Sequence, residues 1–489
     1  MHRIPRFPAR MLWFGAAALS VASGTSLAPR SLEAQKPTTA APSAPARSGS
    51  SSINIPFEHY TLPNGLNVVL SPDHSTPTLA VDVWYHVGSK NEQLGRTGFA
   101  HLFEHVMFTG SGHVPYGLHD KLTEGVGGRN NGSTTNDRTN YWELVPANYL
   151  ESALWLEADR MGWLLDALDT AKLNAQRDIV KNERRQSYDN QPYGRAWEIL
   201  SAATYPKEHP YSWPVIGSMT DLSAASEKDV KDFFRLYYAP SNATLTIVGD
   251  FEPAQAKAWI TKYFGEIPRG AKITRPNPKP VTLAAEKRLV FEDRVQIPRL
   301  YISWPSVGAK HEDDMVLDVL ADVLAGSRIA RVTKQLVYDQ QSAASVTAFQ
   351  STNEDVGDFQ IILTPRPGHT LTELETATDS IIQRLKREGP TAEEVQRSKA
   401  GIELGFVSGL ESNLGKAEQL NSGLVMHGDP GYFRTQYRRA LAITAADVKR
   451  VANSYLTGGR VILSIVPQGR KEDASKPERS VTVSDAGAP

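Results

Sequence analysis

The sequence has no cysteine among its 489 residues. Disulfide bonds, lipid attachment through cysteine and catalysis by a thiol are therefore excluded, while the compartment stays undecided. An excess of charge of one sign is also missing, because 53 Lys and Arg stand against 54 Asp and Glu, dispersed along the chain. The formal net charge of −1 argues against a surface that binds nucleic acid.

Long apolar runs are scarce, and the one that stands out is Met11 to Ser23, which follows three arginines. It is too short to span a bilayer as a helix but has the length of a signal-peptide core. The order of basic, apolar and small residues predicts a signal peptide over 1–34, cleaved near Ala22 or Ala34. Because the arginines are not paired as in a twin-arginine signal, we expect export to the periplasm of a Gram-negative bacterium, or secretion, with no membrane anchor after cleavage.

Three segments lack the pattern of a regular element. A Pro-, Ala-, Ser- and Thr-rich stretch over 35–53 predicts a disordered linker, and the polar residues 470–489 predict a disordered tail. Alternate prolines interrupt 269–287, which we interpret as an interdomain linker. Since 40% of the residues are hydrophobic, a chain this long predicts at least two cores, here an N-terminal domain over 54–268 and a C-terminal domain over 288–469.

The most informative segment runs from His101 to His105 and has the pattern H-x-x-E-H. Two histidines four residues apart lie on the same side of a helix, where both can reach one metal ion, and Glu104 lies between them. Neighbouring apolar residues recur with helical spacing. They are Phe99, Leu102, Phe103, Val106 and Met107. The alternative is a core helix whose histidines only form hydrogen bonds.

Catalytic zinc takes three protein ligands and keeps one open position, so a third ligand is needed. Glu183 is the best downstream candidate, because it lies in a run without Gly or Pro that predicts a helix and follows Val180 by three positions. A solvated surface glutamate is the alternative. Glu157 and Asp178 are weaker rivals, and Glu157 precedes Arg160 in a pattern that predicts an exposed ion pair.

The segment Gly98 to Gly110 resembles the inverzincin peptidases, the family of pitrilysin, insulysin and mitochondrial processing peptidase. Glu183 follows His105 by 78 positions and precedes an arginine, which fits the family's third zinc ligand. Further matches cover most of the mature chain. They include Leu62 to Leu66, Gly88-Ser89, Gly127-Gly128, Asn131 to Thr134, Asp137 to Tyr141, His209 to Tyr211, Ile216 to Ser218 and Tyr237 to Asn242.

The resemblance implies a zinc metalloendopeptidase. One Zn²⁺ per chain would be held by His101, His105 and Glu183, with Glu104 as the general base that takes a proton from the attacking water. The substrates would be peptides or unfolded proteins. The alternatives are a non-catalytic structural subunit and a zinc-dependent peptide-binding subunit without turnover.

The two halves read as divergent copies. Val230 to Tyr237 is similar to Val448 to Tyr455, and an apolar strand follows each. Strands, then helices, then a returning strand predict an α+β fold. The resemblance implies two tandem homologous domains, each a mostly antiparallel sheet with helices packed on one face, which together enclose a chamber.

The second copy shows no metal-binding motif. An ungapped overlay of Gly110 on Gly326 places three apolar residues where the first copy has its His, Glu and His. They are Leu317, Leu320 and Ala321. We therefore expect a core helix at this position in the C-terminal domain.

Peptide binding is expected along the strand around Asn131 to Tyr141, because an extended peptide can add to an open sheet edge. By resemblance, Asn131 and Gly132 occupy the family's substrate-binding Asn-Ala pair, and the glycine is a departure. A turn at Asn-Gly is the structural alternative.

A second departure concerns an arginine and a tyrosine that active family members carry seven residues apart in the C-terminal copy to stabilise the oxyanion. The register fixed by neighbouring residues places Val337 and Ala344 there. Arg331 and Tyr338 have the correct separation, but Arg331 better matches a family arginine at the helix start. Loss of the pair implies a related subunit, in a hetero- or homodimer, that supplies it.

Overall fold

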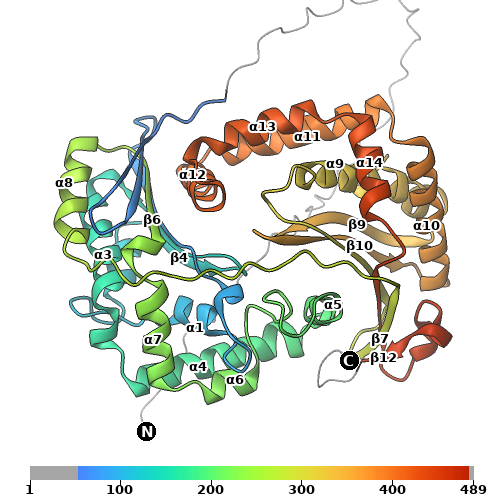
Figure 1. Cartoon of the computed structure of the whole chain (residues 1–489), viewed down its shortest axis with the longest axis horizontal. Helices are drawn as coiled ribbons and strands as arrows, with labels where there is room; N and C mark the ends of the chain where they lie inside the picture. Colours follow the sequence, from blue (N-terminus) through green and yellow to red (C-terminus); the bar gives the residue numbers. More distant parts are fainter. Residues whose placement is uncertain (1–52, 484–489) are drawn as a thin grey trace, which may run out of the picture. The chain divides into compact units, whose positions relative to one another are not determined.

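The computed structural model describes residues 53–483 (Figure 1). The predicted signal peptide 1–34 and almost all of the predicted linker 35–53 lie outside the described residues. Within residues 53–483, no helix has the length and apolar character needed to cross a membrane.

The first half is built on a six-stranded sheet with the order β1-β2-β6-β3-β5-β4. Only β2 and β6 pair in parallel, and β4 is an edge strand that pairs with β5 alone. The strands are β1 (Glu58–Thr61), β2 (Asn67–Pro72), β3 (Thr78–Tyr85), β4 (Arg129–Thr134), β5 (Thr139–Pro146) and β6 (Ala243–Gly249).

The second half repeats this arrangement in the order β12-β7-β11-β8-β10-β9. Here β7 pairs in parallel with both β11 and β12, and the remaining pairs are antiparallel. The strands are β7 (Lys287–Asp293), β8 (Arg299–Val307), β9 (Ala343–Thr352), β10 (Val356–Pro365), β11 (Val461–Pro467) and β12 (Val481–Thr482). The predicted duplication of a mostly antiparallel α+β domain is confirmed.

Helices account for most of the remaining chain. The α-helices of the first half are α1 (Phe99–Val106), α2 (Leu118–Glu124), α3 (Leu150–Ala167), α4 (Thr170–Arg184), α5 (Ala196–Thr204), α6 (Met219–Ala224), α7 (Glu227–Tyr237) and α8 (Pro253–Phe264). Those of the second half are α9 (Asp314–Ala325), α10 (Leu371–Glu388), α11 (Ala392–Gly409), α12 (Asn413–His427), α13 (Phe433–Ala442) and α14 (Ala445–Tyr455).

Shorter helices connect these elements. Single 3₁₀ turns are η1 (Ser89–Asn91), η2 (Ala147–Tyr149), η4 (Pro240–Asn242), η6 (Pro430–Tyr432), η7 (Lys471–Asp473) and η8 (Pro477–Arg479). Two π-helical segments are η3 (Arg185–Asp189), which continues α4, and η5 (Thr333–Asp339).

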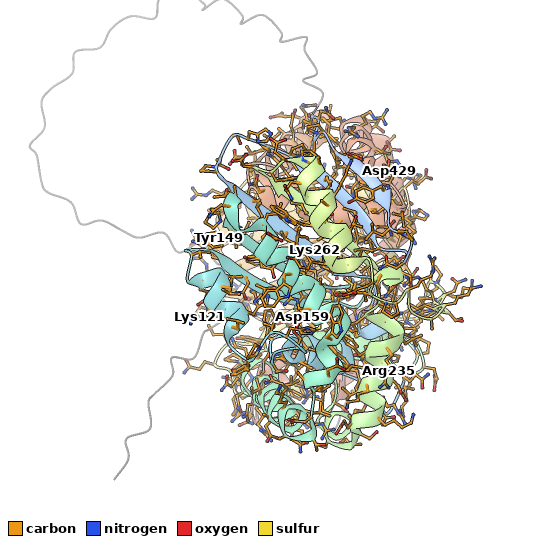
Figure 2. The ribbon with its side chains drawn as sticks, turned by 90° about the vertical axis from the view of Figure 1, so that its left-hand side faces the viewer. Lys121, Tyr149, Asp159, Arg235, Lys262 and Asp429 are labelled. Carbon is orange, nitrogen blue, oxygen red and sulfur yellow. The ribbon has the colours of Figure 1, made fainter. Side chains whose placement is uncertain are left out.

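The helices of each half bury one face of its sheet. Alternate residues of β3, from Leu79 to Tyr85, belong to the core of the first half together with apolar residues of α1, α3, α7 and α8. Figure 2 shows α3 and α8 next to each other on the outer side of this half, with Asp159 on α3 and Lys262 on α8. A second, separate core contains α9, α10 and α14 against β8 and β10.

The opposite face of each sheet receives a helix from the other half. Ala80 and Val248 of the first sheet pack against Ala417 and Leu420 of α12, while α5 packs on β7, β8 and β11 of the second sheet. Figure 1 shows α12 beside the first sheet and α5 beside the second. This exchange ties the two homologous halves together.

The predicted disorder of the tail 470–489 is wrong for 471–483. Strand β12 pairs with β7, and the Val483 amide donates to the Val290 carbonyl at 2.9 Å. Ala474 and Val483 are buried. These two apolar residues, together with strand pairing along the free edge of β7, explain why a mostly polar segment is ordered.

Candidate metal centre

Helix α1 is held at its N-terminus by a tight approach of two backbone segments. Gly98 has a φ of 91°, and a Cβ at this position would lie 2.8 Å from the Ile216 carbonyl oxygen. The buried Glu92 carboxylate accepts hydrogen bonds from the Gly98 and Ala100 amides at 2.9 and 2.8 Å. Both contacts fix where the helix begins, and therefore where its first histidine lies.

The apolar side of α1 is buried as its spacing predicts. Phe99, Leu102, Phe103, Val106 and Met107 are each at most 3% exposed. The polar residues of the motif lie beside this stripe, with His101 9% exposed and Glu104 and His105 only partly buried. The helix is therefore anchored by one side, while its histidines project toward α4.

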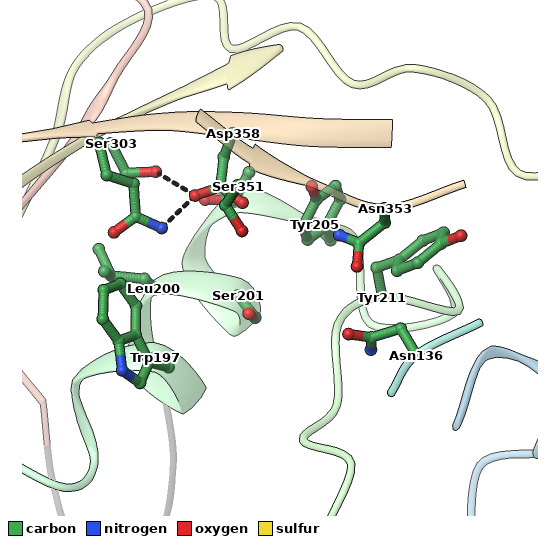
Figure 3. A pocket seen from close by; sticks show the side chains of 12 residues that line it. Asn136, Trp197, Leu200, Ser201, Tyr205, Tyr211, Ser303, Ser351, Asn353 and Asp358 are labelled. Carbon is green, nitrogen blue, oxygen red and sulfur yellow. Dashed lines mark hydrogen bonds between the residues drawn. The ribbon is translucent and has the colours of Figure 1, made fainter. Parts of the chain in front are cut away.

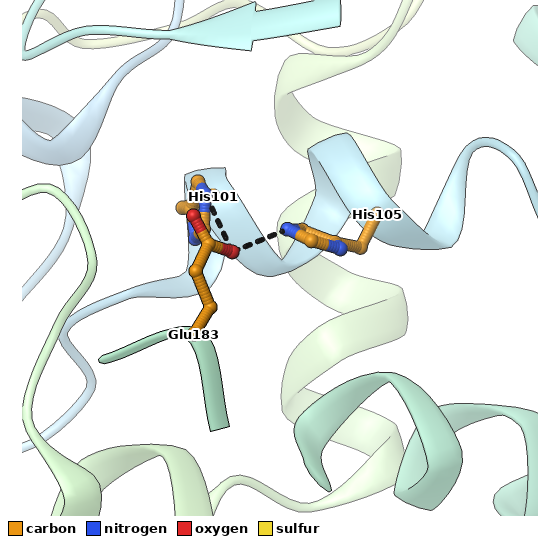
Figure 4. Close-up of side chains that lie close together, drawn as sticks. All are labelled: His101, His105 and Glu183. Atoms are coloured by element: carbon orange, nitrogen blue, oxygen red, sulfur yellow. Dashed lines mark ion pairs between the residues drawn. The ribbon is translucent and has the colours of Figure 1, made fainter. Parts of the chain in front are cut away.

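Glu183 on α4 meets both histidines of α1 (Figure 4). Its Oε2 atom lies 3.2 Å from His105 Nε2 and 3.8 Å from His101 Nε2. Donor atoms bound to one tetrahedral zinc ion at about 2.0–2.2 Å lie about 3.3–3.5 Å from each other. The two imidazole nitrogens lie at similar distances from the carboxylate oxygen, and all three atoms lie within 4.8 Å of one another, so this group of donors suits a zinc ion.

The two other candidates for the third ligand, Glu157 and Asp178, do not belong to this group. Asp178 is exposed. Glu157 is fully buried and forms an ion pair with Arg160, so the prediction of an exposed ion pair is wrong. The stretch around position 157 is so closely packed because β5 and α2 cover α3, which the local sequence does not indicate.

The electrostatics of the three residues suit a cation. Burial raises the pKa of Glu183, but the hydrogen bond with His105 and the charges of both imidazoles outweigh it and leave the pKa below its ordinary value. Burial lowers the pKa of His101, more than the carboxylates of Glu104 and Glu183 raise it. A neutral imidazole and an ionised carboxylate are the forms that coordinate a metal.

Glu104 contacts the edge strand rather than the three converging residues. Its Oε2 accepts a hydrogen bond from Thr134 Oγ1 at 2.6 Å, and a Cβ on Gly132 would lie 3.2 Å from Glu104 Cγ. Sequence reasoning gave Thr134 no role. The alternation of a strand could have found it, because Gly132 and Thr134 lie on the same face of β4.

The pair Asn131 and Gly132 lies within β4, opposite Trp142 and Tyr141 of β5. The alternative of a turn at this position is therefore wrong. Asn131 is exposed, and its Oδ1 accepts a hydrogen bond from the Gly132 amide at 2.9 Å. The pair thus lies on an open strand edge directly next to Glu104.

The corresponding helix of the second half, α9, carries no such group. Leu317 and Leu320 are 0% exposed and Ala321 is 4% exposed, which confirms the expected core helix. Arg331 is bound by the Glu394 carboxylate at 2.7 Å, and Tyr338 is 47% exposed. The two residues with the family's spacing are thus engaged elsewhere or open to solvent.

Among residues 53–483, two further groups of His and carboxylate side chains lie as close together as the first. His119, Glu143 and Glu157 surround Arg160, and the acidic group of Asp137, Glu354 and Asp355 surrounds Lys90. A basic side chain already occupies the middle of each group. His101, His105 and Glu183 differ because no Lys or Arg of the described part of the chain forms an ion pair with them.

Two homologous α+β halves and one H-x-x-E-H helix that faces a distant glutamate define the class of inverted zincins. Comparison with family models agrees. Residues 67–216 match the model described as insulinase (peptidase family M16), and residues 224–402 match the model described as the peptidase M16 inactive domain.

Individual relatives cover most of the chain. It is 31% identical over 403 residues to the zinc protease PqqE of Helicobacter pylori, which spans 81% of this chain and 90% of that protein. It is 25% identical to the mitochondrial-processing peptidase subunit beta of Blastocladiella emersonii, over 83% of this chain and 87% of that one. The crystal structure of a protease from Helicobacter pylori superposes with a TM-score of 0.78 at 28% identity, over 84% of this chain and 99% of the other. The chain belongs to the insulinase family, peptidase family M16.

Proposed function

We propose that this chain is an exported zinc metalloendopeptidase that hydrolyses peptides or unfolded proteins. The observation that carries the proposal is the convergence of His101 Nε2 and His105 Nε2 on one carboxylate oxygen of Glu183. These three residues would hold one Zn²⁺. The name of the relative in Helicobacter pylori, a zinc protease, supports the same metal and reaction class.

The reaction assigns one task to each group. With zinc held by the three residues, the site would gain a Lewis acid, which would polarise the scissile carbonyl and lower the pKa of a water molecule. Glu104 takes the proton from the attacking water and later delivers it to the leaving amine. Thr134 orients Glu104 through its hydrogen bond to Oε2, which leaves Oε1 to face the water.

The peptide would bind along β4. This strand has one free edge, and its residues Asn131 and Gly132 lie next to Glu104. Main-chain hydrogen bonds to an added strand make few demands on the sequence of the peptide. Binding along β4 therefore brings an extended backbone past Glu104 and explains a broad substrate class.

A related subunit would complete the active assembly by supplying an arginine and a tyrosine for the oxyanion. Val337 and Ala344 occupy the family positions here, and Arg331 is held by Glu394. A relative in Blastocladiella emersonii is named as one subunit of a processing peptidase. The alternative, a structural or peptide-binding subunit without turnover, is favoured by the same missing pair.

A fluorogenic peptide assay with and without a chelator tests the proposal. The expected result is hydrolysis that stops with the chelator and returns with Zn²⁺, by the chain alone or after addition of a related subunit. Zinc binding without hydrolysis in either condition would favour the peptide-binding alternative. Absence of zinc from the purified protein would favour the structural one.

A further inference from the structure

A cavity of about 170 Å³ lies between the two halves (Figure 3). Helix α5 and the loops around Asn136 and Tyr211 line it from the first half, and β8, β9 and β10 line it from the second. Sites for drug-sized molecules are about 300–1,000 Å³. The cavity is therefore large enough for one long side chain but not for a whole small-molecule ligand.

Two buried polar atoms in the lining have no hydrogen-bond partner among residues 53–483. They are the hydroxyl of Tyr205 and the Oε1 atom of Gln360, whose residues are 6% and 5% exposed. An unpaired buried polar group is costly, so such atoms indicate a missing partner. Gln360 Oε1 can only accept a hydrogen bond, and the partner must therefore carry donors.

The charge of the lining points to a cation. Asp358 on β10 lines the cavity, and its hydrogen bonds come from neutral groups, Ser303 Oγ at 3.4 Å and the Gln360 amide nitrogen. The lining contains no Lys, Arg or His. Burial raises the pKa of Asp358 to about 6, as expected for a carboxyl that lacks a cationic partner.

Trp197 gives the cavity an aromatic wall. Its side chain lies on α5, is 43% exposed and contacts Tyr301 and Phe349 edge-to-face. An indole and a carboxylate in the lining of one cavity form a favourable environment for a guanidinium or ammonium group. Lining hydroxyls and amides, including Ser201, Ser351 and Asn353, can accept the remaining hydrogen bonds.

The cavity lies on the path of a peptide bound along β4. Gly132 adjoins Glu104, and Asn136, four residues farther along the chain, lines the cavity. Strand β4 ends at Thr134, and Asn136 lies in the turn that leads to β5, so the cavity lies just beyond the end of the strand. A peptide that continues past the end of β4 can place a side chain there.

We propose that this cavity is a specificity subsite that binds the side chain of an arginine or lysine of the peptide, with Asp358 as its counter-ion. The inference rests on the proposed function, because it presumes a peptide along β4. It extends that function by naming a side-chain class that the enzyme selects away from the scissile bond.

Binding can be tested without turnover. The zinc-loaded full chain carrying Glu104→Gln is titrated with fluorescein-labelled ten-residue peptides of Ala, Gly and Ser that contain one arginine at successive positions. Citrulline, which is neutral and nearly the same shape, replaces arginine in the reference set. Because a charge-assisted hydrogen bond is stronger than a neutral one, arginine at one position should bind about tenfold more tightly than citrulline. A lysine set shows whether an ammonium is accepted as well.

Variants of the lining test whether the preference for arginine over citrulline depends on this cavity. Asp358→Asn should reduce the arginine preference to less than about twofold, and Tyr205→Phe should reduce it more weakly. Asp339→Asn is the matched control, because Asp339 is an exposed carboxylate of the same half, paired with Lys334, outside the cavity. It should keep the preference. Thermal unfolding of each variant verifies the fold.

Equal affinity for arginine and citrulline at every position, no binding of any peptide, or an unchanged preference in Asp358→Asn would overturn the proposal. The wild-type chain is assayed separately for cleavage of the same peptides. Cleavage without an arginine preference would reject the subsite alone. An arginine preference without cleavage, with the related subunit present, would reject the proposed activity and leave the subsite.

Discussion

The two halves share the order of five strands in their sheets and yet differ in one corresponding helix, which is α1 in the first half and α9 in the second. Helices α7 and α14 occupy corresponding positions, 218 residues apart at both ends. In α1 the motif places two imidazoles and a carboxylate beside the apolar stripe, whereas the aligned positions of α9 are buried Leu317, Leu320 and Ala321. One scaffold thus carries either a helix with polar His and Glu side chains or an apolar core helix at the same position.

The buried glutamates of the two halves also differ, in the number of basic partners and in the direction of their pKa shifts. In the first half, Glu143 and Glu157 share Arg160, and burial raises the pKa of both despite the charge of Arg160. In the second half, Glu375 meets three basic side chains. They are Arg288, Arg460 and Lys476. Burial raises the pKa of Glu375, but the hydrogen bonds from Arg288, Lys476 and Ser475 outweigh it and lower the pKa to about 2.

The largest expected effect is a difference in turnover between a variant in α1 and a variant in α9. Glu104→Gln should reduce turnover in the active assembly by about 10²–10⁴-fold, because the general base is lost, while the zinc content stays unchanged. Leu320→Met, at the aligned position of α9, should keep the wild-type rate because the volume is conserved. Steady-state kinetics with metal analysis measure both. A Glu104→Gln variant with wild-type turnover would show that the role of Glu104 is wrong.

The next largest effect is a loss of stability, without a loss of zinc, when a core residue of α9 is shortened. Leu320→Ala should lower the free energy of unfolding by about 2–5 kcal/mol, because it leaves a cavity in the core of the second half. The zinc content of the folded variant should not change. Urea unfolding and metal analysis of the same sample test this. Zinc loss from a folded Leu320→Ala variant would contradict the independence of the two cores.

Acid should remove a stabilising contribution from the buried ion pairs of Glu375 in the second half. A carboxyl whose pKa is lower in the folded than in the unfolded chain stabilises the fold above its ordinary pKa, and the contribution is lost as the pH falls toward the folded value. For Glu375 that window runs from about pH 4.5 down to about 2. Glu375→Gln should cost about 3 kcal/mol at neutral pH and flatten the dependence of stability on pH within this window.

The control for this prediction is Glu373→Gln, which changes a more exposed glutamate of the same helix. It should leave the acid dependence intact. Denaturant unfolding at a series of pH values distinguishes the two variants. An unchanged pH slope in Glu375→Gln would contradict the assignment.

The smallest expected effect tests the hydrogen bond between Glu104 of α1 and Thr134 of β4, which the aligned Leu320 of α9 cannot form. Thr134→Val removes the hydrogen bond to Glu104 and should lower turnover about tenfold with unchanged zinc content. Thr134→Ser keeps a hydroxyl and should restore most of the rate. Equal rates for Thr134→Val and wild type would remove the orienting role of this residue.

Local periodicity made much of the first half's site predictable. The spacing of His101 and His105, the apolar stripe of α1 and the helical run that carries Glu183 follow from helix geometry, and the alignment of α9 followed from the duplication. The structure brings these residues together as expected. The edge strand around Asn131 was also identified from its sequence.

Contacts between distant segments could not be predicted. The exchange of α5 and α12 between the halves and the pairing of β12 depend on segments that are distant in the sequence, and the burial of Glu157 depends on how β5 and α2 pack against α3. Local sequence reveals none of these contacts. The same applies to Thr134 and to the cavity around Asp358. Each of them arises where two segments meet.

Zinc stoichiometry tests the account most directly. Mass-spectrometric metal analysis after dialysis should find one zinc per wild-type chain and less than about a tenth of that in Glu183→Gln. Asp178→Asn, which changes an exposed carboxylate on the same helix, should retain full zinc. Full zinc occupancy in Glu183→Gln would contradict the claim that α1 and α4 jointly bind the metal.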